Sequence, residues 1–155
     1  MKDFHVPRLD KDTLALDSAS AIMLSLVGDM FQLGPAFLAR PDDAVLLHDL
    51  RRAVKRCRDA MLLFQTVFGA RLGEFQRSLA PLQDDLGSAL DALSALEFAR
   101  GLDASEYRDR AIGNLEKRYL QHVTIFWQTW DTGFGKEQHL RRWQSYFGSF
   151  LQSPS

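Results

Sequence analysis

One short stretch of the sequence concentrates the side chains that bind anions. It holds a histidine and five cationic residues within eleven positions: His48, Arg51, Arg52, Lys55, Arg56 and Arg58. Arginine offers a planar fork that fits phosphate oxygens, and lysine acts as a compact point charge. A histidine beside an anion gains a proton more readily, so His48 would add a pH-dependent charge. These residue types favour the binding of an anionic ligand rich in phosphate.

Helical geometry gathers these residues on one side of the stretch. Each residue of an α-helix advances by about 100°, so positions are measured here as angles from His48. The basic residues fall between about 280° and 80°, in the order Arg58, Arg51, Lys55, Arg52 and Arg56. The opposite arc, at about 180° to 260°, is apolar and holds Leu47, Leu50, Val54, Cys57 and Met61. We therefore predict one core-facing side and one cationic side about 15 Å long, which suits several linked phosphates better than one.

Like charges at helical spacing repel one another, so this cationic side should have a compensating partner. One alternative is a solvated face, or pairing with the acidic residues of the following helix, Asp84, Asp85 and Asp91. The other alternative is an elongated anion bound along the side. Asp59 lies at about 20°, within the cationic side, where its charge is expected to weaken the binding of a polyanion.

The same stretch resembles a known family. The sequence His48-Asp49-Leu50-Arg51, followed by Lys55-Arg56-Cys57-Arg58, is similar to the signature of the CHAD domain, the conserved histidine α-helical domain. Further along, Leu82-Gln83-Asp84-Asp85-Leu86-Gly87 and Asp91 are similar to the motif of the following helix in that family. Both motifs occur in order and at the right separation. The resemblance covers about residues 42–97 and extends more weakly into the fourth predicted helix.

The resemblance implies both a fold and a function. CHAD domains consist of two similar four-helix bundles that bind inorganic polyphosphate through histidine and basic residues, without catalysis by the domain itself. This chain is long enough for one bundle and resembles the C-terminal half, so a homodimer would restore the two-bundle arrangement. The polyphosphate-binding positions implied here are His48, Arg51, Lys55, Arg56 and Arg58, with Arg52 beside them. Gln83 and Asp91 are expected to be structural partners.

The elements that position the cationic side are predicted to be helices throughout. Apolar residues recur three and four positions apart, and Gly and Pro fall at plausible helix ends. We expect helices at residues 11–33, 41–68, 72–100, 104–130 and 136–151, the first ended by Gly34-Pro35. Pro81 is expected to kink the third helix or to begin a new one. The predicted fold is all-α, an antiparallel four-helix bundle with an additional C-terminal helix, in a single domain over residues 1–155.

Charge and cysteine usage exclude several classes of protein. The chain has 19 Lys and Arg against 20 Asp and Glu, a formal net charge of -1, which argues against a general nucleic-acid-binding protein. The single Cys57 excludes an intramolecular disulfide and predicts a cytoplasmic protein. Polyphosphate granules are then an expected place of binding. No membrane contact is expected, because the longest apolar run, residues 21–27, is too short to span a bilayer.

No catalytic residue, cofactor or metal site is predicted. His5, His48, His122 and His139 lack the paired spacing of metal ligands, and no phosphate-binding loop or nucleophile elbow occurs. Two other functions stay open. One is a histidine phosphotransfer domain that uses His48, although Arg52 occupies a position where such domains usually have Gly. The other is a divergent module that binds an acidic protein partner.

The last two predicted helices carry a basic pair and an apolar stripe. Lys117 and Arg118 of the fourth helix would extend the basic surface, although exposed helix charges explain them equally well. The last helix carries an apolar stripe at helical spacing: Leu140, Trp143, Phe147, Phe150 and Leu151. We expect this stripe to pack in the core, and a dimer interface is the alternative.

Overall fold

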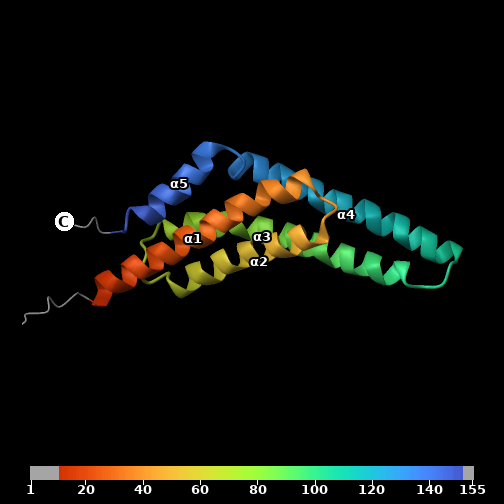
Figure 1. Cartoon of the computed structure of the whole chain (residues 1–155), viewed down its shortest axis with the longest axis horizontal. Coiled ribbons are helices and arrows are strands. Elements are labelled where there is room, and N and C mark those ends of the chain that lie inside the picture. Colours follow the sequence, from red (N-terminus) through yellow and green to blue (C-terminus); the bar gives the residue numbers. More distant parts are fainter. Residues whose placement is uncertain (1–10, 152–155) are drawn as a thin grey trace, which may run out of the picture.

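Five α-helices build the part of the chain that the computed structural model describes, residues 11–151 (Figure 1). They are α1 (Lys11–Ala39), α2 (Ala44–Leu63), α3 (Leu72–Arg100), α4 (Glu106–Gly133) and α5 (Glu137–Gly148). Successive helices from α1 to α4 run in opposite directions, and α5 returns towards the start of α1 (Figure 1). The prediction of an all-α antiparallel bundle is confirmed. His5 and both ends of the predicted domain lie outside the described residues.

The core forms where these helices pack on their neighbours, α1 on α2, α2 on α3, α3 on α4 and α1 on α5. The side of α2 that was predicted to be apolar enters this core. Its residues Leu47, Leu50, Val54, Cys57 and Met61 have no exposed surface. Because these positions recur at helical spacing, their burial leaves the opposite side of α2 facing solvent.

The fourth position of the bundle is shared between α4 and α5. The buried residues of α4, Val123, Phe126 and Trp130, all lie in its second half. Phe75 of α3 packs against α5 instead, with its ring 4.7 Å from Trp143 and stacked 4.6 Å from Tyr146 between centroids. The C-terminal aromatic stripe is therefore core at Trp143 and Phe147, as expected, while Leu151 remains 41% exposed.

The end of α1 differs from the prediction, because the helix continues through Gly34 and Pro35 to Ala39. Proline at position 35 removes one backbone donor but lies on the exposed side of the helix. Gly34 is buried, and a Cβ atom there would overlap the indole ring of Trp130. This glycine therefore allows the indole ring of Trp130 to lie directly against α1, and it does not terminate the helix.

The boundaries of α2, α4 and α5 also need correction. α2 begins at Ala44, because Asp43 precedes it as an N-cap whose carboxylate accepts hydrogen bonds from the backbone N–H groups of Val45 and Leu46. It ends at Leu63, five residues before the predicted end at Phe68. α3 runs without interruption across Pro81, so no new helix begins there. The ends of α4 and α5 differ from the expected ones by up to three residues.

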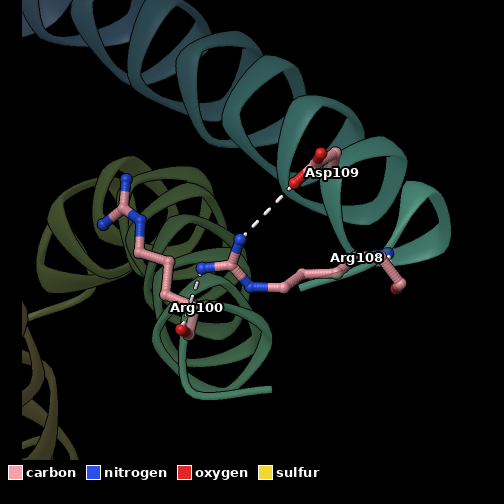
Figure 2. A network of polar contacts seen from close by, with 4 residues as sticks. Arg100, Arg108 and Asp109 are labelled. Atoms are coloured by element: carbon pink, nitrogen blue, oxygen red, sulfur yellow. Dashed lines mark hydrogen bonds and ion pairs between the residues drawn. The ribbon is translucent and has the colours of Figure 1, made fainter. Parts of the chain in front are cut away.

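The far ends of α3 and α4 form a hairpin that extends beyond α1 and α2 (Figure 1). The Arg108 guanidinium closes its turn by donating to the Arg100 carbonyl oxygen at 3.1 Å and pairing with Asp109 at 3.4 Å (Figure 2). Ser105 caps α4 by accepting from the Arg108 backbone N–H at 3.1 Å. The hairpin turn is thus fixed by polar contacts.

α1 is the most apolar long helix of the described chain. Over Ala15–Ala39 it is long and apolar enough, by length and composition, to cross a membrane, with a mean hydropathy of 1.5. The prediction considered only uninterrupted apolar residues and missed this longer segment. Core helices of soluble proteins have the same property, and Met23, Val27 and Met30 of α1 are fully buried in the bundle.

Candidate functional site

The exposed side of α2 carries the basic residues that the sequence analysis identified. We call His48, Arg51, Arg52, Lys55, Arg56 and Arg58 together the basic ridge. Arg58 is half-buried and the other five side chains are exposed. The structure therefore presents these side chains on one helix, on the side opposite to its buried apolar residues.

Within residues 11–151 no acidic side chain forms an ion pair with the basic ridge. The ion pairs there, at up to 4 Å between nitrogen and oxygen, all involve other cations. Two of the three acids of α3 that were considered as partners face α4 instead. The Asp85 carboxylate interacts with His122 and Thr129 of α4, and Asp91 lines a pocket between α3 and α4 with Arg118. The proposed pairing of the ridge with these two acids is therefore wrong.

One member of the ridge is held in place by a second helix. The Arg58 guanidinium donates a hydrogen bond to the Gln83 side-chain oxygen of α3 at 2.6 Å. This bond agrees with the prediction that Gln83 is a structural partner. Because the amide oxygen is neutral, it fixes the direction of the guanidinium without cancelling its charge. The positive charge of Arg58 remains for a ligand.

The other flank of the ridge faces α1 across a groove. This groove, with a volume of about 450 Å³, is lined by Arg52 and Arg56 of α2 together with the acids Asp29 of α1 and Asp49 of α2. We call it the α1–α2 groove. The ridge therefore has two environments: a crest at His48 and Lys55, where Asp59 is the one acid on α2, and a flank at the groove where the carboxylates of Asp29 and Asp49 are present.

The thiol beneath the ridge takes no part in anion binding. Cys57 is fully buried, and this burial, reinforced by the negative charge of Asp29, raises the pKa of its thiol to about 12. The thiol is therefore protonated at neutral pH and lacks the reactivity of a thiolate. Within the described residues no three His, Cys, Asp or Glu side chains gather as metal ligands would.

The basic residues of α4 do not extend the ridge. Lys117 lines a shallow pocket formed by α4 alone, and Arg118 faces the pocket beside Asp91 and His122. Since α4 packs mainly on α3, these charges belong to a different surface from that of α2.

Sequence reasoning missed the two acids of the α1–α2 groove. Asp49 lies at about 100° from His48, next to Arg56, so the same angular calculation could have found it. Asp29 could not be found in that way, because its position depends on how α1 packs against α2. The groove is consequently a feature that only the tertiary structure reveals.

Comparison with known families supports the resemblance. The family model described as "CHAD domain" matches residues 5–100 of the chain. The match includes the whole basic ridge and ends at the last residue of α3, so the expected extension into the fourth helix is not supported. It extends instead through α1, which the sequence motifs did not cover. No curated protein and no solved structure matches the chain significantly.

Proposed function

Because the chain belongs to the CHAD domain family, we propose that it binds inorganic polyphosphate, without catalysis, along the basic ridge centred on His48. CHAD domains are associated with the binding of polyphosphate and are in general non-catalytic binding domains. The cytoplasm, and polyphosphate granules within it, is the corresponding proposed location. A fluorescent fusion protein that leaves such granules when polyphosphate is degraded would support this location.

One observation carries the proposal, namely that the cations of the ridge have no acidic partner within 4 Å among the described residues. Cations at helical spacing destabilise one another mildly, and a bound polyanion relieves this repulsion. The ridge is about 15 Å long, so it contacts several linked phosphates at once. Release of counterions from the polyanion then favours binding, as it does for nucleic acids.

Binding should be measured by titrating the purified protein with long-chain polyphosphate at low and at moderate salt. The test variant combines His48→Ala, Arg51→Ala and Lys55→Ala, which removes the crest of the ridge. The matched control combines Arg77→Ala and Lys117→Ala, which also removes one arginine and one lysine, here from exposed positions on α3 and α4. Circular dichroism establishes that both variants remain helical.

We expect the affinity of the test variant for polyphosphate to fall at least about tenfold, while that of the control changes little. The slope of the logarithm of affinity against the logarithm of salt concentration should become shallower by the amount expected for about two lost phosphate contacts. Equal losses in both variants would mean that net charge alone governs binding, and would contradict a site on α2. Absence of binding by the unmodified protein at low salt would contradict the function itself. Capture of an acidic protein that salt but not polyphosphate displaces would favour the alternative of a protein partner.

A further inference from the structure

The α1–α2 groove carries acidic side chains on both walls and basic side chains on the wall formed by α2. Asp29 is exposed on α1, while Asp49, Arg52 and Arg56 belong to α2. None of the four takes part in an ion pair within 4 Å among residues 11–151. Apolar side chains, Leu26 and Leu33, line the same groove between the charges. The groove thus combines apolar side chains with acids and bases that form no ion pair within 4 Å among residues 11–151.

The face of α1 beside this groove is uncovered and has little charge. Its exposed residues are mostly small: Ala15, Ser18, Ala21, Ile22, Ser25, Asp29, Gln32, Pro35 and Ala39. About one third of the most apolar part of the helix is buried by the rest of the protein. A solvent-facing helix usually carries several charged residues, whereas over residues 15–39 of α1 Asp29 is the one exposed charged residue and Asp17 is half-buried. The face therefore has the composition of a packing surface.

We propose that the α1–α2 groove is the contact surface of a homodimer, in which the groove of one chain packs against the same groove of a second copy. A two-fold axis brings each residue of such a surface opposite other residues of the same surface. A surface can satisfy its own charges in this way only if it carries both signs, as this groove does. Asp29 and Asp49 of one copy then pair with Arg52 and Arg56 of the other.

Charge and side-chain size favour a second copy over other occupants. The two carboxylates of the groove weaken the attraction of a polyanion to Arg52 and Arg56, so the polyphosphate proposed for the ridge is held mainly by its other members, which lie outside the groove: His48, Arg51, Lys55 and Arg58. A lipid surface requires bulky apolar side chains, and Ile22 is the one large apolar residue that is well exposed on the described part of α1, at 45%. Small residues, by contrast, allow a second helix to approach closely. The inference does not depend on polyphosphate binding.

The dimer is tested by measuring the mass of the full-length protein in solution over a wide range of concentrations. We expect about twice the 17.6 kDa of one chain. Two variants reverse one sign each: Asp29→Lys/Asp49→Lys makes the groove basic, and Arg52→Glu/Arg56→Glu makes it acidic. Each variant alone should be a monomer, with a dimer dissociation constant raised at least about 100-fold, because like charges then face each other. An equimolar mixture of the two should form a heterodimer.

The control variant Asp103→Lys/Asp131→Lys reverses two exposed acids outside the groove and should remain a dimer. Circular dichroism of each reversed variant checks that the helices are intact. A monomeric unmodified protein would overturn the proposal, as would reversed variants that still dimerise or that fail to pair when mixed. A monomer that floats with phosphatidylcholine vesicles would also overturn it, and would assign the face of α1 to a lipid surface.

Discussion

Asp59 places a negative charge within the basic ridge, and removing that charge should strengthen polyphosphate binding. It is exposed on α2, one helical turn after Lys55 and within about 20° of the line through His48. A bound phosphate chain that contacts Lys55 must therefore pass close to this carboxylate. Asp59→Asn removes the repulsion, and Asp59→Lys converts it to attraction.

The size of the effect follows from the helical spacing. Side chains four positions apart are about 6 Å from each other, so a phosphate at Lys55 lies at about that distance from Asp59. Two unit charges at this distance in water repel by about 0.7 kcal/mol. Screening at 0.1 M salt, with a Debye length of about 10 Å, reduces this to about 0.4 kcal/mol. For two phosphates within reach, Asp59→Asn should improve affinity about fourfold, and Asp59→Lys about fifteenfold.

The assay is the same polyphosphate titration, repeated at several salt concentrations for each variant. Because both substitutions are exposed, they should leave the thermal unfolding temperature nearly unchanged. The matched control is Asp103→Asn, which changes the net charge equally but lies in the α3–α4 turn, at the other end of the molecule from the end of α2 (Figure 1). Its effect should be less than about twofold, because salt screens charges at that separation.

An unchanged affinity in Asp59→Lys would refute the proposal that polyphosphate binds along the crest, because two charges one helical turn apart must interact measurably. Equal gains in Asp59→Asn and Asp103→Asn would show that the ligand responds to net charge and does not occupy a defined path along α2.

Two other predictions concern stability. Gly34→Ala should lower the free energy of unfolding by about 1 to 3 kcal/mol, because the added methyl group overlaps the ring of Trp130. Gly87→Ala, where a Cβ atom meets nothing within 4 Å, should be neutral or stabilising, and urea unfolding of both variants decides this. Because the pKa of Cys57 rises from 9.0 to about 12 on folding, its contribution to stability is complete below the unfolded value and is lost as pH rises through the folded one. The urea concentration at the unfolding midpoint should therefore decrease as pH is raised above 9.0, and it should decrease less steeply in Cys57→Ala than in the unmodified protein. Equal dependence of the two midpoints on pH would contradict a contribution of the Cys57 thiol.

The parts of the structure that could be predicted from sequence are those that depend on local spacing. The apolar side of α2 is one such feature, since burial of Leu47, Val54 and Met61 follows from the helical period alone. The basic ridge opposite them follows for the same reason. Capping is also local, yet Asp43 was placed inside the helix that it caps, because an acid suits both the N-cap and the first turn.

The features that escaped prediction depend on packing between distant residues. Gly34 has the sequence signature of a helix end, and its role becomes clear only because Trp130 lies against it. The acidic residues of the third predicted helix suggested a partner for the ridge, but in the structure Asp85 and Asp91 face α4. Periodicity gives the direction of a side chain relative to its own helix, and it does not give the neighbour that the side chain meets.

The order of helix contacts has a consequence for how the chain acquires its structure. The main contacts join consecutive helices, with one exception, the packing of α5 on α1, which links the two ends of the described chain. Proteins dominated by contacts between sequence neighbours fold quickly, because little loop entropy is lost before each contact forms. The packing of α5 on α1 costs the most loop entropy, because these two helices are the farthest apart in the sequence. We therefore expect α5 to dock late, and substitutions at Trp143 or Phe147 to accelerate unfolding more than they slow folding.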